Sequence, residues 1–93
     1  MIYGIITTKQ YRKSLRRFSK HKDFKLKKLN EIVAMLQSGG SLPDNSHDHQ
    51  LSGHLQKYRE CHVQPDVLLL YEVCDDILVL VLVNLGSHQE IFG

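Results

Sequence analysis

The first 40 residues of the chain combine one short apolar run with two segments of helical periodicity. Ile2 to Ile6 is rich in β-branched residues and predicts a first strand. Thr7 is then placed to cap a helix, and Gln10 completes a capping-box pattern. Apolar residues follow at helical spacing and should face the core: Tyr11, Leu15 and Phe18.

A second helix is predicted from Asp23 to the Gly39-Gly40 pair, which ends it. Its apolar residues recur at intervals that turn one face inward: Leu26, Leu29, Ile32, Val33 and Leu36. Because the connection between the two helices is short, they should form a helical hairpin.

The remainder of the chain predicts a loop and three strands. Residues 38–56 are polar, rich in turn-forming residues and without period. Residues 57–63, 67–74 and 77–84 predict strands, with turns at 64–67 and 75–76. We therefore expect one α+β domain, residues 1–93, in which an N-terminal strand and a two-helix hairpin precede three antiparallel strands. The helices should pack on a twisted antiparallel sheet.

The two tight turns also predict which side chains meet. If Cys74 pairs with Ile77, Val67 lies opposite Asn84, and the last strand ends beside the turn at residues 64–67. Three residues that can exchange protons should then converge at one end of the sheet: His62, Asp66 and His88.

Charge divides the chain into two unequal parts. Residues 1–30 hold ten lysines and arginines against Asp23 alone, a net charge of +9, whereas residues 31–93 carry −7. Basic residues of the first helix recur every three or four positions and share a face: Lys9, Arg12, Lys13, Arg16 and Lys20. This basic stripe indicates either binding to a polyanion such as nucleic acid or a solvated helix surface, and charge alone does not choose between them.

Composition also limits the compartment in which the protein is expected. The longest apolar run, Ile77 to Val83, has seven residues, far fewer than the roughly 20 of a membrane span. The N-terminal residues lack the pattern of a secretory signal, so a cytoplasmic protein is expected. Cys61 and Cys74 are accordingly interpreted as reduced core thiols, and Glu60 as solvated.

The second half of the chain contains a set of short motifs: the run YRECHVQPD at 58–66, Leu70-Tyr71, LGSH at 85–88, the closing Phe92-Gly93, and a loop motif with Asp48-His49, Leu51 and Gly53. Together these motifs resemble the YafQ branch of the RelE/ParE superfamily of bacterial toxins. The match is dense from about residue 48 onward, and before that it rests on the order of the elements.

The resemblance implies a toxin of a type II toxin–antitoxin pair, with no cofactor. Such a toxin cleaves messenger RNA on the ribosome, is silenced by a small antitoxin, and contacts operator DNA only through that antitoxin. The residues that the family uses for cleavage match His49, His62, Asp66 and His88 here, a C-terminal aromatic matches Phe92, and a basic residue near the phosphate matches Arg59. The family commonly has tryptophan where this chain has Val67, which puts stacking of a base at that position in question.

Metal-free cleavage of RNA needs a base for the 2′-hydroxyl proton, an acid for the leaving 5′-oxygen and a cation for the phosphate. Histidine can serve in either proton transfer near neutrality. His88 is assigned as the acid, mostly on the resemblance, and the base is either Asp66 or His49. His62 is expected to orient or donate to the phosphate, and Arg59 to bind it through its planar fork of donors.

Other interpretations compete with this one. A metal site is conceivable at His47, Asp48, His49 and His54, although their spacing fits no standard motif. A ParE-like toxin would bind and inhibit DNA gyrase without cutting anything, and it would not need a cluster of histidines and an acid. Phe92 is as consistent with core packing as with contact to a base. Tyr71 is a candidate for contact with RNA, but a tyrosine flanked by Leu70 in a strand is more often half-buried in packing.

Overall fold

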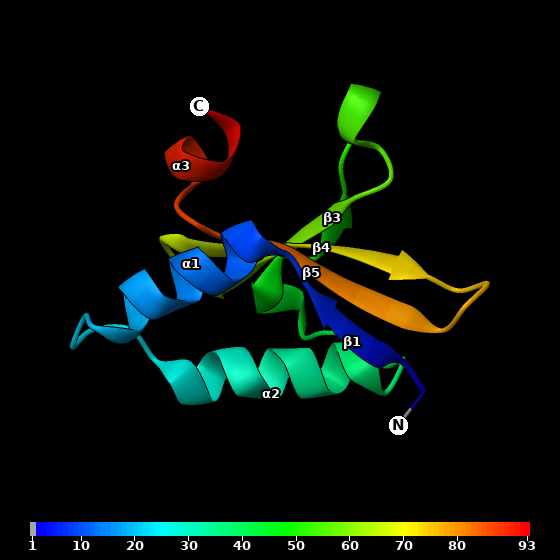
Figure 1. Cartoon of the computed structure of the whole chain (residues 1–93), viewed down its shortest axis with the longest axis horizontal. Helices are drawn as coiled ribbons and strands as arrows, with labels where there is room; N and C mark the ends of the chain where they lie inside the picture. The colour runs from blue at the N-terminus through cyan, green and yellow to red at the C-terminus, as the bar shows by residue number, and fades with distance from the viewer. Residues whose placement is uncertain (1) are drawn as a thin grey trace.

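Five strands form one sheet in the order β1-β5-β4-β3-β2, with helices on both faces (Figure 1). The computed structural model describes residues 2–93. The strands are β1 (Gly4–Thr7), β2 (His49–Gln50), β3 (Arg59–Gln64), β4 (Val67–Cys74) and β5 (Val79–Gly86). The helices are α1 (Lys9–Ser19), α2 (Leu26–Gln37) and α3 (His88–Phe92), with 3₁₀ turns η1 (Asp44–Ser46) and η2 (Gly53–Leu55). The predicted α+β class, with two helices before three antiparallel strands, is confirmed.

The sheet is mixed and not wholly antiparallel as predicted. β1 pairs in parallel with β5, Gly4 lying opposite Val79. Parallel neighbours need a long connection, and here α1, α2 and three strands intervene between them in the chain. The predicted loop 38–56 also contributes a strand, because β2 pairs with Arg59 and Glu60 of β3.

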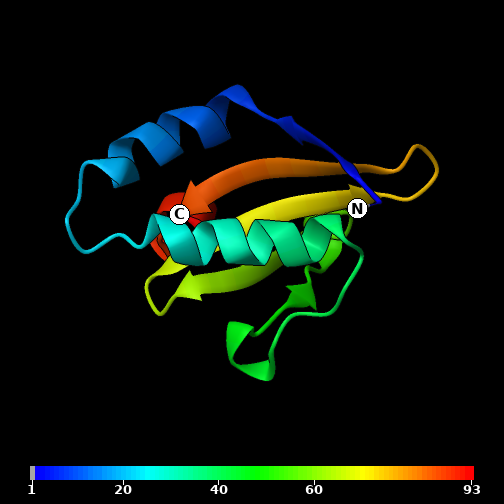
Figure 2. The ribbon, with the colours of Figure 1, turned by 90° about the horizontal axis from the view of Figure 1, so that it is seen from below.

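The core lies between the sheet and the pair α1 and α2, which cover one face, whereas α3 lies on the opposite face (Figures 1 and 2). Leu26 begins α2 but is 46% exposed, so the inward face of this helix starts at Leu29 and not at Leu26 as predicted. The core is built from buried residues of both layers: Tyr11, Leu29, Ile32, Leu36, Cys61, Val63, Val67, Leu69, Tyr71, Leu80, Leu82 and Leu85.

Both long helices begin later than predicted. Thr8, not Thr7, caps α1, because its hydroxyl accepts a hydrogen bond from the Tyr11 N–H while Thr7 still belongs to β1. α2 begins at Leu26, and the N–H of Lys25 before it is bound by the side chain of Gln64. Gln64 is distant in sequence, so no local pattern could have located this helix start.

The β4–β5 hairpin has a different register from the predicted one. Cys74 pairs with Val79 and not with Ile77, because residues 75–78 form a wider turn in which Leu78 has a φ of 53°. A second shift occurs between Leu70 and Tyr71, where β5 carries one extra residue. Val67 therefore does not face Asn84.

The extra residue of β5 is Val83, and α1 holds it in place. The hydroxyl of Thr8 donates to the Val83 carbonyl, and the hydroxyl of Ser14 donates to the side chain of Asn84. A β-bulge of this kind turns the following residues to the other face of the sheet. Contacts from α1 thus help to determine which residues of β5 reach the far end of the sheet.

The two cysteines have different environments, and both are free thiols. Cys61 is completely buried in the core, as predicted, and burial raises the pKa of its thiol to about 12. A thiol with this pKa is inert as a nucleophile near neutrality. Cys74 is only half-buried and does not belong to the core, which corrects the prediction for this residue.

The sequence pattern missed α3, which follows β5 directly. The Ser87 hydroxyl accepts the Glu90 N–H while the Glu90 carboxylate accepts the Ser87 N–H, a complete capping box. The hydrogen bond from the Ser87 backbone lowers the pKa of Glu90 below its ordinary value of 4.5. Partial burial opposes this shift, and Arg17 of α1 adds to it through its hydrogen bond to the Glu90 carboxylate and its charge.

Replacement of Glu90 by glutamine should therefore weaken the fold in a pH-dependent way. A carboxyl whose pKa is lowered in the folded state contributes stability above its ordinary pKa of 4.5 and loses it as pH falls through the folded value. The pair with Arg17 is largely exposed, so we expect a loss of only about 0.5 kcal/mol near neutrality. Urea unfolding of the wild-type protein and of Glu90→Gln, from about pH 3 to about pH 7, measures this loss of unfolding free energy. Glu31→Gln, which changes an exposed acid on α2, is the control, and an equal loss in both variants would contradict the argument.

Candidate active site

One end of the sheet brings together the three residues whose convergence the sequence predicts. His62 of β3 lies opposite Leu68 of β4, and Leu68 lies opposite Gly86 of β5, so the three form a row across the strands. Asp66 occupies the β3–β4 turn, and His88 follows Gly86 by two residues. A pocket of about 300 Å³ at this sheet end is lined by His62, Asp66, Leu68, Ser87 and His88, together with Pro65 and Gln89.

The short helix α3 positions His88 in this pocket. It packs so closely on the end of β5 that a Cβ on Gly86 would lie 3.1 Å from the Glu90 carboxylate and 3.3 Å from the Glu90 Cβ. A side chain at position 86 would therefore crowd Glu90, and glycine leaves room for this approach. The ring of Phe92, half-buried, lies 4.9 Å from the His88 ring between centroids, so Phe92 packs against the predicted acid.

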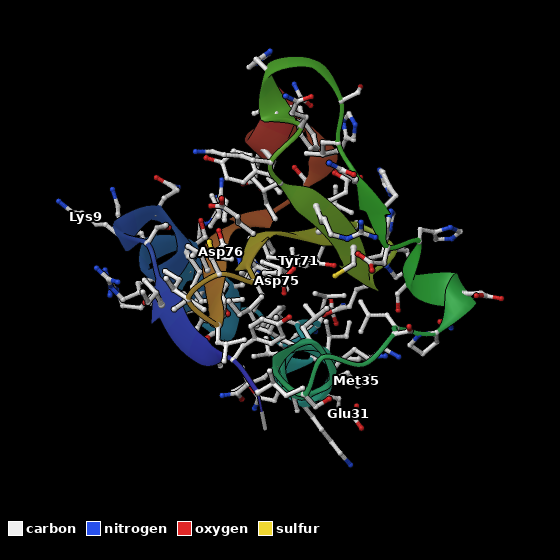
Figure 3. All side chains as sticks on the ribbon, turned by 90° about the vertical axis from the view of Figure 1, so that its right-hand side faces the viewer. Lys9, Glu31, Met35, Tyr71, Asp75 and Asp76 are labelled. Carbon is white, nitrogen blue, oxygen red and sulfur yellow. The ribbon has the colours of Figure 1, made fainter. Side chains whose placement is uncertain are left out.

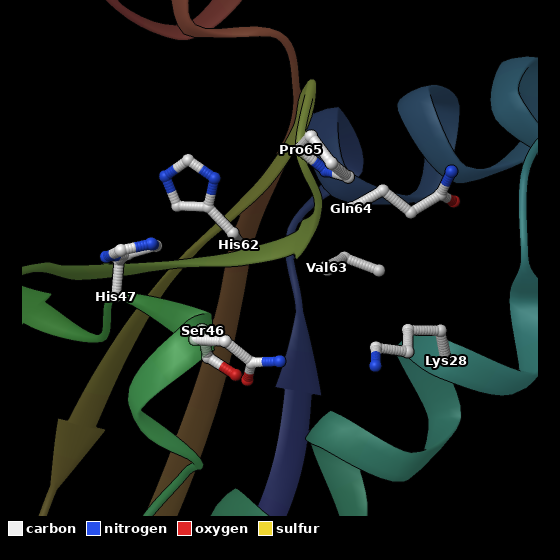
Figure 4. A pocket seen from close by; sticks show the side chains of 8 residues that line it. Lys28, Ser46, His47, His62, Val63, Gln64 and Pro65 are labelled. Carbon is white, nitrogen blue, oxygen red and sulfur yellow. The ribbon is translucent and has the colours of Figure 1, made fainter.

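A second pocket adjoins the first, and His62 lines both of them. Its volume is about 430 Å³, and it lies between α2, η1 and the end of β3 (Figure 4). Lys28, Asn45 and His47 contribute to its lining. The rings of His47 and His62 meet edge to face with centroids 5.2 Å apart.

His49 is held outside both pockets. It belongs to β2 opposite Glu60, and its Nδ1 lies 2.7 Å from the His47 carbonyl oxygen. A carbonyl only accepts, so Nδ1 carries a proton. The Nε2 atom lies 3.4 Å from the Glu60 carboxylate, a contact that becomes an ion pair when the ring is protonated. Both ring nitrogens of His49 are thus directed at protein acceptors.

Glu60 is buried, which corrects the prediction that it is solvated. It is 6% exposed, and its Oε2 has no hydrogen-bond partner within the described chain. A buried carboxylate oxygen without a partner is costly. Strand alternation places Glu60 on the same face of β3 as His62, and this is the one sequence signal that could have linked it to the candidate site.

Arg59 does not reach the pocket that contains His88. Its guanidinium donates to both carboxylate oxygens of Asp48 and to the hydroxyl of Tyr71, which itself donates to Asp48. Burial tends to lower the pKa of Arg59, but the hydrogen bonds and charge of Asp48 and Tyr71 outweigh it and raise the pKa. Burial and the bond to Asp48 raise the pKa of Tyr71 as well. Tyr71 is fully buried in the middle of the sheet (Figure 3), as the packing interpretation predicts.

The basic stripe lies on the outer surface of α1. All five side chains are exposed, and Lys9 points away from the sheet (Figure 3). Arg12 donates to the backbone and hydroxyl oxygens of Thr7. None of the five lines the two pockets described above, so the stripe forms a surface separate from the candidate site.

His47 is a candidate site residue that sequence reasoning did not select. It was considered only as a metal ligand, because it stands beside Asp48 and His49 in a loop without period. Its backbone has a φ of 51°, in the left-handed region that non-glycine residues seldom adopt. Val67, which stands where the family commonly has tryptophan, is buried in the core.

Neither a cluster of metal ligands nor a membrane-spanning helix occurs in the described part of the chain. Within residues 2–93, no three His, Cys, Asp or Glu side chains gather so that they could hold a metal ion. No helix in the same range has the length and apolar composition required to cross a membrane.

Fold and site together define a small α+β protein with two histidines and a carboxylate at one sheet end. The profile of a family described as "Bacterial toxin of type II toxin-antitoxin system, YafQ" matches residues 3–93. The mRNA interferase toxin YafQ of Escherichia coli K12 is 36% identical over 86 residues, which is 90% of this chain and 89% of that protein. The chain belongs to the YafQ family of toxins of type II toxin–antitoxin systems.

Solved structures agree with this family. A metal-bound toxin from Helicobacter pylori is 40% identical, with a TM-score of 0.89 over 99% of this chain and 100% of that one. YafQ in the E. coli DinJ–YafQ toxin–antitoxin complex is 30% identical, with a TM-score of 0.86 over 100% of both chains. The fold of this chain therefore matches that of two bacterial toxins, one of them in complex with its antitoxin.

Proposed function

We propose that this protein is a metal-independent endoribonuclease that cuts messenger RNA and so inhibits translation, with the whole chain acting as one toxin domain. The pocket lined by His62, Asp66 and His88 carries the proposal. Two imidazoles and a carboxylate supply the proton acceptor, the proton donor and the phosphate contact that RNA cleavage needs. The relatives named mRNA interferases support it and give no support to a gyrase-binding toxin.

In the proposed reaction, the 2′-oxygen of one nucleotide attacks the adjacent phosphorus. The bond from 2′-oxygen to phosphorus forms as the bond to the 5′-oxygen breaks, which leaves a 2′,3′-cyclic phosphate and a 5′-hydroxyl. His88 donates a proton to the leaving 5′-oxygen, and His62 donates to a non-bridging oxygen of the phosphate. The requirement for a 2′-hydroxyl makes RNA the substrate and excludes DNA.

Asp66 is the better candidate for the base that takes the 2′-hydroxyl proton. It lines the same pocket as His62 and His88. His49 contacts the His47 carbonyl and Glu60, so its ring would have to leave both before either nitrogen could serve substrate. Arg59 would similarly have to leave Asp48, and we keep it outside the proposed substrate contacts.

The partners follow from the family and from charge. We propose that a cognate antitoxin neutralises this toxin in the cytoplasm, as the E. coli complex of DinJ with YafQ exemplifies for a relative. Residues 1–30 carry a net charge of +9, which favours an acidic antitoxin segment and also ribosomal RNA. Binding to operator DNA would occur only through the antitoxin.

Replacement of His88 by alanine should abolish cleavage without unfolding the protein. Loss of a general acid typically costs roughly 10²–10⁴-fold in rate, whereas an exposed residue of α3 should change the unfolding free energy by less than about 0.5 kcal/mol. Cleavage of a ribosome-bound message measures the first quantity and urea unfolding the second. His54→Ala, an exposed histidine in η2, should remain active. A fully active His88→Ala variant would overturn the assignment of His88 as the general acid.

The metal-free reaction has a test of its own. Loss of wild-type activity when a transition-metal chelator is added would overturn it.

The base is identified by comparing Asp66→Asn with His49→Gln. We expect Asp66→Asn to lower kcat by at least about 10²-fold and to remove the rise of rate with pH that deprotonation of the base produces. His49→Gln should retain this rise, because it changes a residue outside the pocket. The reverse result, with the rise lost only in His49→Gln, would assign the base to His49.

Neutralising part of the basic stripe should weaken association with the ribosome. The triple variant Lys9→Gln, Lys13→Gln and Lys20→Gln removes three exposed charges and spares Arg12, which bonds to Thr7. We expect about tenfold weaker co-sedimentation with ribosomes at moderate salt, and a shallower dependence on salt. The matched control replaces three exposed lysines outside the stripe: Lys22, Lys27 and Lys57. Equal effects in the two triple variants would show that the stripe is a solvated helix surface without a specific role in ribosome binding.

A further inference from the structure

We infer that the second pocket, beside the candidate active site, binds the nucleotide next to the scissile phosphate and holds that nucleotide's own phosphate with Lys28 and His47. The inference rests on the proposed ribonuclease function and deepens it by naming a substrate subsite. It also gives a role to His47, which the proposed reaction does not use.

The position of the pocket is the first argument. His62 forms a wall shared with the pocket that contains Asp66 and His88. An RNA strand whose scissile phosphate contacts His62 must place an adjacent nucleotide on one side of that ring. The volume of about 430 Å³ lies within the range of roughly 300–1,000 Å³ that small-ligand sites occupy.

The chemistry of the lining is the second argument. Lys28 supplies an ammonium, Asn45 an amide and His47 an imidazole, all of which can donate hydrogen bonds. Figure 4 shows the Lys28 side chain directed from α2 toward β3, with the rings of His47 and His62 on the opposite side of the pocket. Among residues 2–93, no acidic side chain pairs with Lys28. A lysine without an acidic partner in a pocket suits a phosphate.

The rigidity of His47 is the third argument. Its N–H donates to the Asp44 carbonyl within η1, and its own carbonyl accepts from His49. The preceding residue, Ser46, is buried and anchors the turn. His47 nevertheless keeps the unfavourable φ of 51°, and its ring meets that of His62 at an interplanar angle of 67°. A strained residue fixed by its surroundings is pre-organised, so little further ordering is needed when a ligand binds.

A short RNA oligonucleotide with 2′-O-methyl groups tests the inference, because it lacks the attacking hydroxyl and cannot be cut. Fluorescence anisotropy with such an oligonucleotide at several salt concentrations gives the Kd. Lys28→Gln should raise the Kd about fivefold to tenfold and reduce the slope of log K against log salt by about 0.7, the value for one phosphate contact on a single strand. Lys27→Gln, an exposed neighbour on α2 that does not line the pocket, is the matched control. Equal effects of the two variants, or none, would overturn the inference.

His47→Asn gives a second test that preserves the backbone. Asparagine tolerates a positive φ, so the variant removes the ring without straining the loop further. We expect a raised KM with an unchanged kcat on ribosome-bound message, and in the wild-type protein an oligonucleotide-dependent NMR shift of the His47 ring. An unmoved His47 resonance with bound oligonucleotide would overturn the subsite.

The subsite and the proposed function fail in different ways. Binding of the uncleavable oligonucleotide does not depend on whether the protein cuts RNA. Normal cleavage by both Lys28→Gln and His47→Asn would contradict the subsite and leave the proposed ribonuclease function standing. If the wild-type protein cuts no RNA but binds the oligonucleotide through Lys28, the ribonuclease proposal would be wrong and the RNA-binding pocket would stand.

Discussion

Burial of three consecutive leucines in the central strand β4 constrains the rest of the molecule. Leu68, Leu69 and Leu70 are all buried, and neighbouring residues of a strand point to opposite faces, so both faces of the sheet must be covered. The pair α1 and α2 covers the face of Leu69. On the other face lies the much shorter helix α3, which has five residues (Figure 1). The candidate site therefore lies where the cover is thin enough to leave polar side chains and pockets at the surface.

In the loop that joins α2 to β3, successive side chains also point in opposite directions. Asp48 turns to Arg59 and the buried hydroxyl of Tyr71, whereas its neighbours His47 and His49 contact His62 and Glu60. A carboxylate between a guanidinium and a phenol satisfies most of its hydrogen-bonding capacity in a region of restricted solvent access. One partly exposed polar cluster on one side of the segment thus fixes the position of two histidines on the other.

The order of the main elements could be predicted from the sequence because each has a local signal, helical spacing in α1 and α2, alternation in β3 and long apolar runs in β4 and β5. The convergence of His62, Asp66 and His88 could also be predicted, since it requires only that β3, β4 and β5 pair as consecutive hairpins, and it holds although residues 75–78 form a wider turn than predicted. The β4–β5 register could not, because it depends on a turn with Leu78 at positive φ and on a bulge held by Thr8. The burial of Glu60 and the location of His47 depend on contacts across the sheet edge that no local pattern contains.

The length of α3 has a consequence for how the toxin persists in solution. A helix of five residues has almost no stability of its own in water and remains folded only through its cap and its packing. Such an end segment opens at a free-energy cost well below that of global unfolding. Each opening carries His88 away while the strands, which end at Gly86, stay paired. Folded molecules in which the pocket around His88 is disassembled therefore exist in equilibrium with intact ones, in a proportion set by the C-terminal turn and not by the core.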